Sequence, residues 1–287
     1  MRSRSFIRVQ DGCEGHCSYC IVPKVRSQER SFTPEEIIVR INQKAAAGYK
    51  EVVLTGTEVG AYRYEGIGLT GLLERILAET DIPRLRLSSL QPKEITPELL
   101  NLWQNPRLCP HFHLSLQSGS DAVLRRMRRR YNAKGYSQAV SLIRSMVPDV
   151  AITTDIIVGF PGENEEEFAE SHEFCRQTGF ARIHVFPYSS RPGTEAAQMP
   201  DKVNAAVKRE RLRKMLALAD ESAAGFRQQY LGRQMAVLWE QQAGDVWSGL
   251  TGNYIRVYIK SGQDLANRIT KVKLEKLHKD GVWGSLS

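Results

Sequence analysis

Short β-rich apolar runs alternate with amphipathic helical stretches along the first three quarters of the chain. The runs are FIRVQ (6–10), EVVLT (51–55), LRLSSL (85–90), FHLSL (112–116), VAITTDIIVG (150–159) and ARIHVFPY (181–188). Between them, residues 33–36 (TPEE) combine a helix cap, a proline at the first helical position and a glutamate three residues after the cap. This alternation predicts an α/β fold in which parallel strands and helical crossovers form a partial or full (β/α)6-type barrel.

The pattern changes after a long charged helical stretch that ends near Tyr230. The segments RQMAVLWEQ, NYIRVYIK and RITKVKLEKL alternate apolar and polar residues and are separated by turns that contain Gly or Asn. They predict a small carboxyl-terminal all-β barrel. We therefore expect two domains, residues 1–227 and residues 228–287, with an active site at the carboxyl ends of the parallel strands.

Composition narrows the class of protein. The chain has 287 residues, of which 41% are hydrophobic, and no apolar run approaches the ~20 residues that cross a bilayer. Its first residues lack the apolar core of a signal peptide, so we expect a cytoplasmic protein without a membrane partner. Five cysteines in such a chain argue against a disulfide framework. The formal charge of +8 favours a polyanionic partner, with nucleic acid the leading candidate.

Three of the five cysteines lie in the segment DGCEGHCSYC, directly after the first predicted strand. Cys13, Cys17 and Cys20 have the spacing C-x3-C-x2-C. Three thiolates on a short loop can hold three corners of a 4Fe–4S cluster and leave the fourth iron open for chemistry. The spacing alone also permits a zinc site completed by His16, although structural zinc prefers a closed set of four ligands, or no metal at all.

The same segment resembles the signature of the radical S-adenosylmethionine (SAM) superfamily, which has an aromatic residue, here Tyr19, before the last cysteine. The resemblance implies one 4Fe–4S cluster on Cys13, Cys17 and Cys20, with SAM bound at the open iron. It also implies that one electron from the cluster splits SAM into methionine and a 5′-deoxyadenosyl radical, which abstracts hydrogen from an unactivated carbon.

Longer segments resemble the tRNA methylthiotransferases within this superfamily: LTGTEVGAY (54–62), HLSLQSGSDAVLRRMRRRY (113–131), TTDIIVGFPGENEEEF (153–168) and FPYSSRPGTEA (186–196). The resemblance implies that Glu58 accepts hydrogen bonds from the SAM amino group. It extends the cofactor-binding set to Tyr19, Gly56, Glu58, Gln117, Ser118, Asp155 and Gly159. No residue beyond the cluster ligands is expected to be catalytic.

The last sixty residues resemble the small RNA-binding barrel, called TRAM, of the same enzymes. The resemblance implies contacts with the anticodon region of tRNA. We expect these contacts from Tyr254 and Arg256 in the barrel, and from the arginine run at 125–130 through Arg125, Arg126 and Arg129. The alternative is a solvated helix face for the arginines and a core position for the aromatic residue.

Within the family, AITTDIIVGFPGE and NYIRVYIK look most like the branch that adds a methylthio group to C2 of N6-threonylcarbamoyladenosine. Sibling branches act on isopentenyladenosine in tRNA or on an aspartate of a ribosomal protein. Other expected properties are a reductase or flavodoxin-type electron donor and a monomeric state. The rivals are a non-catalytic RNA-binding iron–sulfur fragment and a radical SAM enzyme that performs a different hydrogen abstraction.

One departure from the family concerns sulfur. Its members begin with a domain whose three cysteines hold a second 4Fe–4S cluster, the carrier of the transferred sulfur, whereas here Met1 lies a dozen residues before Cys13. Cys109 and Cys175 are far apart, and we expect both to be buried apolar side chains. We therefore expect SAM cleavage without complete sulfur insertion. We also expect that deleting residues 228–287 would leave the cluster and SAM cleavage intact.

Overall fold

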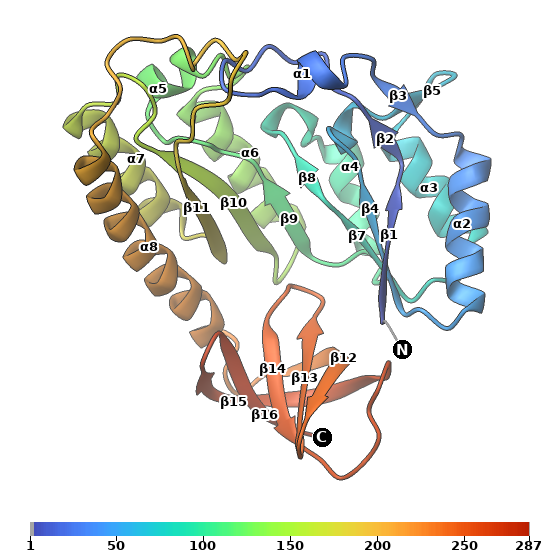
Figure 1. The fold of residues 1–287 in the computed structure, drawn as a ribbon. Helices are drawn as coiled ribbons and strands as arrows, with labels where there is room; N and C mark the ends of the chain where they lie inside the picture. The colour runs from blue at the N-terminus through green and yellow to red at the C-terminus, as the bar shows by residue number, and fades with distance from the viewer. Residues whose placement is uncertain (1–2, 287) are drawn as a thin grey trace.

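The computed structural model describes residues 3–286, which form an open parallel sheet wrapped by helices and a second, closed barrel below it (Figure 1). The wall of the open sheet, called here the half-barrel, contains β1 (Arg4–Arg8), β4 (Glu51–Thr55), β7 (Arg84–Leu87), β8 (Ser89–Leu90), β9 (His111–Leu114), β10 (Ala151–Val158) and β11 (Arg182–Pro187). Its strands pair in the orders β1-β4-β7 and β8-β9-β10-β11, and all these pairs are parallel. The predicted partial barrel is therefore confirmed.

Helices cover the convex side of the half-barrel. They are α2 (Pro34–Ala46), α3 (Leu69–Glu79), α4 (Pro97–Asn101), α5 (Asp121–Arg126), α6 (Ala133–Met146), α7 (Glu165–Thr178) and α8 (Ala205–Gln228). The predicted start of α2 is confirmed, because Thr33 accepts a hydrogen bond from the amide of Glu36 and forms a complete capping box with it. Shorter elements are α1 (Val22–Val25), the 3₁₀ turns η1 (Val59–Ala61), η2 (Pro92–Glu94) and η3 (Leu102–Gln104), and the strands β2 (Gln10–Asp11), β3 (Arg30–Ser31), β5 (Arg63–Tyr64) and β6 (Ile67–Gly68).

The two faces of the half-barrel differ in polarity. Ile152, Ile156 and Val158 of β10 belong to the main hydrophobic core that the helices complete. Because successive side chains of a strand point to opposite faces, Thr153 and Asp155 lie on the concave face. The same alternation in the other strands gives a polar concave surface, which is the side on which a ligand can be enclosed.

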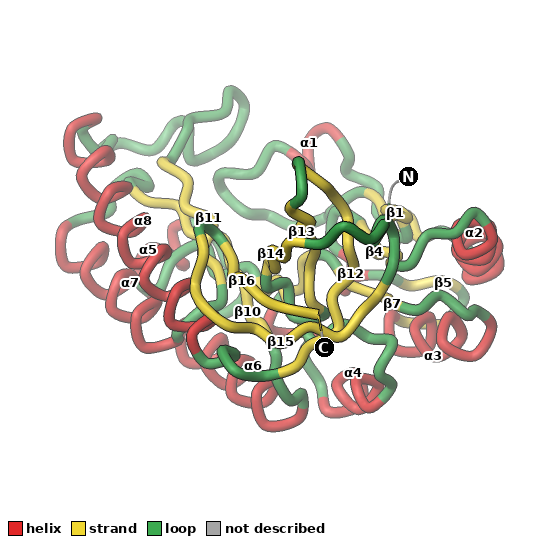
Figure 2. The backbone as a smooth tube through the Cα atoms, turned by 90° about the horizontal axis from the view of Figure 1, so that it is seen from below, coloured by secondary structure: helices red, strands yellow, loops and turns green. Residues whose placement is uncertain are grey.

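A second unit, called here the small barrel, follows α8. It is a closed barrel of β12 (Gln234–Ala243), β13 (Val246–Thr251), β14 (Arg256–Lys260), β15 (Ile269–His278) and β16 (Gly281–Leu286), in the order β12-β13-β14-β16-β15. Its own core includes Trp239, Trp247 and Val257. Seen from below, the small barrel lies across the amino-terminal end of the half-barrel, with the helices arranged around it (Figure 2). The predicted small all-β barrel is confirmed.

A buried charge cluster joins the two units. The Glu51 side chain is fully buried and accepts hydrogen bonds from Arg4 at 2.7 Å and from Arg86 at 3.0 Å. Arg84 and Arg86 also donate to the backbone carbonyls of Ala236, Leu250 and Gly252 in the small barrel. The guanidinium groups therefore satisfy a buried carboxylate and the carbonyls of another unit at the same time.

None of the helices in the part of the chain that the structure describes has the length and apolarity of a membrane span.

Candidate functional site

The three clustered cysteines occupy one loop at the carboxyl-terminal end of the half-barrel. Cys13, Cys17 and Cys20 lie between β2 and α1, are half-buried and form no disulfide. All three line a single pocket of about 190 Å³, called here the cofactor pocket. Burial raises the pKa of the Cys13 thiol to about 11, so this group remains protonated until a cation replaces the proton. The convergence of the three thiols on one cavity fits an iron–sulfur cluster that leaves one iron for a further ligand.

Backbone geometry explains how the loop reaches this position. Gly12 has φ +79°, and a Cβ atom there would lie 1.9 Å from the carbonyl oxygen of Gln28. Only glycine fits such an approach. The buried Gln10 side chain donates to the carbonyl of Gly12 at 2.7 Å and accepts from the amide of Glu58 at 2.8 Å. Gln10 thus fixes the cysteine loop to the loop after β4.

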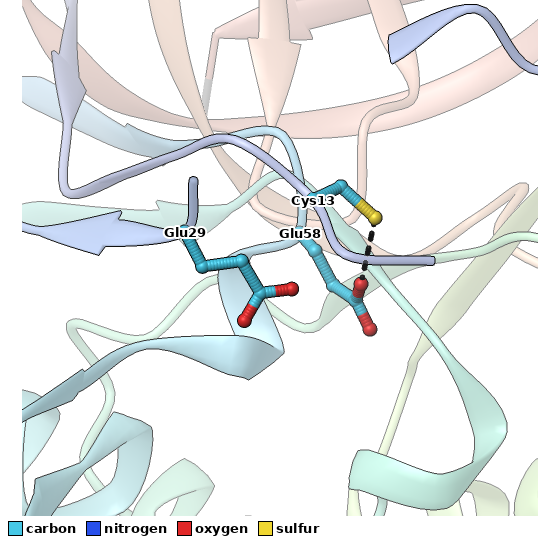
Figure 3. A group of neighbouring side chains, drawn as sticks. All are labelled: Cys13, Glu29 and Glu58. Atoms are coloured by element: carbon cyan, nitrogen blue, oxygen red, sulfur yellow. Dashed lines mark hydrogen bonds between the residues drawn. The ribbon is translucent and has the colours of Figure 1, made fainter. Parts of the chain in front are cut away.

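Glu58 lies beside the first cysteine, as Figure 3 shows. Its Oε2 accepts a hydrogen bond from the Cys13 thiol at 3.3 Å, while its Oε1 accepts from Gln91 Nε2 at 2.7 Å and lies 3.0 Å from Lys93 Nζ. Burial works against the charged form, but the hydrogen bonds from Lys93 and Cys13 hold the pKa of Glu58 below its usual value. The carboxylate therefore stays negative at the pocket wall, where it can accept N–H bonds from a cationic amino group.

Glu29 completes a compact group with Cys13 and Glu58 (Figure 3). Among residues 3–286 this is the only group of three or more His, Cys, Asp or Glu ligand atoms close enough to hold a metal ion. Glu29 Oε1 already accepts a hydrogen bond from the amide of Glu14 at 3.0 Å. Since Cys13 also belongs to the set of three thiols, the group is part of the cysteine site.

Arg129 lines the cofactor pocket. Its Nη1 donates to Cys17 Sγ at 3.3 Å and its Nε donates to the Tyr131 hydroxyl at 2.9 Å, with the guanidinium 4.8 Å from the centre of that ring. Burial opposes the charge, but Tyr131, Tyr19 and Cys17 raise the pKa of Arg129. This cation faces a cysteine sulfur, and its expected contact with an RNA phosphate stays a prediction.

The rest of the arginine run is divided between different environments. Arg126 forms a two-fold ion pair with Glu167, at 2.9 and 2.6 Å, and also donates to the carbonyl of Gly162. Arg126 thus makes an internal contact between α5 and α7, and its expected role in RNA binding stays a prediction. Arg125 is exposed. Its role stays a prediction.

The two barrel residues predicted to bind RNA have different positions. Tyr254 lies at the junction of the two units, where its ring centre is 4.6 Å from that of His111 and 4.0 Å from the guanidinium of Arg86. It therefore packs between the half-barrel and the small barrel, and its expected base-stacking role stays a prediction. Arg256 is about one-third exposed and pairs with Asp280 at 3.0 Å. Its contact with RNA stays a prediction.

Of the predicted cofactor-binding residues, Tyr19 and Glu58 line the cofactor pocket with the cysteines. The ring of Tyr19 also packs edge-on against Phe160, 6.3 Å between centres. Gly56 permits the approach of Gln10, because a Cβ atom there would lie 2.9 Å from the Gln10 carbonyl oxygen. Gly56 therefore acts through the support of the loop.

The other predicted cofactor-binding residues lie outside the lining of this pocket. Gln117 has φ +70° and its amide donates to the carbonyl of Asp155, whose side chain is 3.1 Å from His113 Nε2. Ser118 is fully buried and its hydroxyl accepts from the amide of Ser120, so its side chain is not presented to a ligand. Gly159 has φ +70° and its amide donates to Glu163.

Three residues around the pocket were not among the predicted set. Gln91, Lys93 and Glu94 come from the segment that follows β8, and the first two contact Glu58. Burial raises the pKa of Glu94 to about 7, and its Oε2 accepts from the amide of Gln91. The polar sequence QPKE directly after a predicted strand was the available signal, because strand ends on this side of the sheet meet at the site.

Comparison with known proteins agrees with this geometry. Residues 7–175 match the family described as "Radical SAM superfamily". The chain belongs to the radical SAM superfamily. It is 37% identical to the threonylcarbamoyladenosine tRNA methylthiotransferase MtaB of Bacillus subtilis, over 96% of this chain and 63% of that protein. It is 42% identical to MtaB of Treponema pallidum, over 98% of this chain and 58% of that protein.

The name of a third relative specifies a different nucleoside. The chain is 38% identical to the tRNA-2-methylthio-N(6)-dimethylallyladenosine synthase of Caldicellulosiruptor saccharolyticus, over 98% of this chain and 61% of that protein. This radical SAM chain thus spans roughly three fifths of the length of these curated relatives.

Solved structures show the same fold at low identity. Coproporphyrinogen III oxidase (HemN) of Escherichia coli has a TM-score of 0.57 at 15% identity, covering 88% of this chain and 67% of that one. Methylornithine synthase (PylB) has a TM-score of 0.54 at 17% identity, covering 75% and 62%. The superfamily implies a 4Fe–4S cluster and SAM, and the three thiols on one pocket fit that requirement.

Proposed function

We propose that the chain is the radical SAM core and RNA-binding barrel of a tRNA methylthiotransferase. Its proposed substrate is C2 of N6-threonylcarbamoyladenosine beside the anticodon. The names of its relatives support this reaction class, and the observation that carries the proposal is the convergence of Cys13, Cys17 and Cys20 on one pocket beside Glu58. The proposed domains are residues 1–227 and 228–287, and the end of α8 at Gln228 before β12 supports that division.

The side chains around the pocket have complementary roles in this proposal. Cys13, Cys17 and Cys20 would hold the cluster, which when bound supplies the electron that splits SAM into methionine and a 5′-deoxyadenosyl radical. Glu58 accepts hydrogen bonds from the amino group of SAM. Arg129 stabilises negative charge on the sulfur of Cys17 through its hydrogen bond.

Other residues orient this set and exclude water. Lys93 and Gln91 hold the Glu58 carboxylate in one orientation from the same turn. Tyr19 covers the pocket together with Phe160, which is fully buried. A dry, pre-oriented pocket keeps a radical away from solvent and directs it to one hydrogen atom.

Sulfur and electrons come from other groups in this proposal. Cys109 and Cys175 are buried and belong to no group of metal-ligand atoms within residues 3–286. We therefore propose that the transferred sulfur is carried on ligands outside these residues. A reductase or flavodoxin-type protein would supply the electron, and a second SAM would supply the methyl group.

The second candidate is the same reaction on dimethylallyladenosine in tRNA. Its support is the synthase of Caldicellulosiruptor saccharolyticus, whose 38% identity lies between those of the two MtaB proteins. The two candidates share every residue of the cysteine site. They differ in the group on N6 of the adenine, which carries a carboxylate in one case and is apolar in the other.

The test is anaerobic reconstitution followed by iron and sulfide analysis and an assay for 5′-deoxyadenosine. We expect about four irons per chain, SAM cleavage, and no methylthio nucleoside by mass spectrometry when the chain acts alone on tRNA. Cleavage should increase more with an RNA stem-loop that carries threonylcarbamoyladenosine than with one that carries dimethylallyladenosine. Failure to bind iron would contradict the proposed enzymatic activity. A greater increase in cleavage with the dimethylallyladenosine stem-loop would favour the second candidate.

A further inference from the structure

The strand β11 is one of the two outer edges of the half-barrel, and β1 is the other. It pairs with β10 on one side, and no other strand of the described sheet pairs with its outer side. Ile183 of β11 packs into the helix-covered core, so Arg182, His184 and Phe186 point to the concave side. Phe186 is 51% exposed. A large aromatic ring is therefore presented to solvent on the side that faces the interior of the half-barrel.

A groove of about 690 Å³ runs from this edge to the small barrel. It is lined by residues of β10 and β11, of α8, and of the loops and strand ends of the small barrel (Figure 1 shows these elements together). Its charged residues are four cations against two carboxylates, in addition to His184: Arg182, Arg227, Arg256 and Lys279, with Asp220 and Asp280. The groove therefore has an excess of positive charge.

The cations of this groove are only partly neutralised. Arg256 pairs with Asp280 at 3.0 Å, and Arg227 donates to the carbonyl of the same residue while its Nε is buried without a hydrogen-bond partner. Arg182 and Lys279 are exposed and form no salt bridge with the residues that the structure describes. By contrast, Arg126 and Arg129 of the arginine run at 125–130 form internal contacts.

We propose that this groove binds the phosphate backbone of a single-stranded segment of the RNA substrate, with Phe186 as a stacking platform for one base. The proposal rests on the proposed function, since it names the surface that holds the tRNA. Phe186 lies two residues beyond His184 of the groove lining, on the same face of β11. Unpaired cations along a groove and a nearby exposed aromatic ring are features by which single-stranded nucleic acid is bound.

The position of the groove suits a nucleotide that must reach the cofactor. Thr153 and Arg182 are register partners near the groove floor, and Ile157 and Phe186 are partners near the strand ends. At about 3.3 Å per residue, the concave face rises roughly 17 Å from Thr153 to Val158 at the end of β10. The concave face therefore gives an RNA strand that starts in the groove a path toward the carboxyl-terminal end.

The first experiment measures the salt dependence of binding to an anticodon stem-loop RNA. In the full chain, the double variant Arg182→Gln/Lys279→Gln should lower the slope of log affinity against log salt by about 1.4 to 1.8, because each lost contact with single-stranded or duplex phosphate removes about 0.7 to 0.9. The charge-matched control is Arg63→Gln/Arg209→Gln, which also replaces two exposed arginines without salt bridges in the described structure. The control should leave the slope unchanged.

The second experiment separates stacking from charge. Phe186→Ala should weaken RNA binding about five- to a hundredfold without changing the salt slope, because a stacked base releases no counterions. Phe186→Trp should retain the affinity. Melting temperatures and iron content should match those of the parent chain for all these variants, which verifies that the fold is preserved.

Three results would contradict the proposal that the groove binds RNA. They are an equal loss of slope in both double variants, a larger loss in the control, or competition by poly-glutamate as strong as that by RNA of equal charge. These outcomes remain distinct from failure of the proposed function. If the proposed function were wrong, the parent chain would cleave SAM but would show no salt-dependent binding to the stem-loop at all.

Discussion

The two ends of the half-barrel use charged residues in opposite ways. At the amino-terminal end, Glu51 is surrounded by Arg4, Arg84 and Arg86, and two of these arginines also bind carbonyls of the small barrel. At the carboxyl-terminal end, Glu58 and three free thiols border a pocket. The difference teaches that a charge enclosed by partners from two units holds the fold together. A polar group beside a cavity is available to a ligand.

The largest expected effect is loss of the cluster and of SAM cleavage, from a substitution in the cofactor pocket. Cys17→Ala should abolish both the visible thiolate-to-iron absorption after reconstitution and the formation of 5′-deoxyadenosine. The reason is that the variant keeps only two of the three thiolates that hold the cluster. The matched control is Cys175→Ala, which removes a buried thiol of α7. The control should retain iron and SAM cleavage. A Cys17 variant that kept both properties would remove the loop from the chemistry.

The next largest effect is a loss of stability, expected from a substitution at the amino-terminal end of the half-barrel. Glu51→Gln should lower the free energy of unfolding by about 3 to 5 kcal/mol, because it leaves buried guanidinium groups without their carboxylate. Denaturant titration measures this loss. Glu173→Gln serves as the control, since Glu173 forms an exposed pair with Arg176 that water screens and that contributes little to stability. Equal losses in the two variants would contradict the view that the amino-terminal cluster is structural.

A smaller effect depends on pH. Burial raises the pKa of Glu94 to about 7, from an ordinary value of 4.5, so the folded state binds this proton more tightly than the unfolded state. Stability from this group is therefore complete below about pH 4.5 and is lost as the pH rises through 7.

Glu94→Gln should match the parent chain near pH 4 and exceed its stability by about 1 to 3 kcal/mol near pH 8. Thermal or denaturant unfolding at the two pH values measures the difference, with Glu98→Gln as the control on an exposed carboxylate at the start of α4. A benefit of the same size at both pH values would show that the carboxylate of Glu94 is not destabilised by its surroundings.

The smallest effect tests the divided arginine run. Arg126→Gln should cost about 1 to 2 kcal/mol of stability, because it removes a two-fold contact with Glu167 and a hydrogen bond to the Gly162 carbonyl. Arg125→Gln should change the unfolding free energy by less than about 0.5 kcal/mol, since that side chain is exposed. If the two substitutions had equal effects, the assignment of Arg126 to the internal structure would be wrong.

The junction also changes what deletion of the small barrel should do. From the pattern of strands, residues 228–287 were expected to be removable without loss of the cluster. The structure shows that Arg84 and Arg86 donate to carbonyls of that unit and that Tyr254 packs on His111. Deletion would expose these buried groups, so we expect destabilisation of the half-barrel as well as loss of RNA contacts.

The sequence determined the features that depend on local order. Strand periodicity, the cap at Thr33 and the spacing of Cys13, Cys17 and Cys20 each act over a few residues, and all were readable before the fold was known. The resemblance to a family then extended these features to a cofactor and a reaction class. The resemblance also implied that Glu58, after the predicted strand at 51–55, accepts hydrogen bonds from the SAM amino group, and the structure places Glu58 beside Cys13.

Only the tertiary structure decided which charges are enclosed. Arg126, Arg129 and Arg125 look alike in one short run, yet the first binds Glu167, the second binds the Cys17 sulfur and the third is exposed. Their partners come from residues far away in the chain. The energy of a charge depends on its distance to other charges and on its exposure to water, and these quantities are fixed by packing and not by neighbours in sequence.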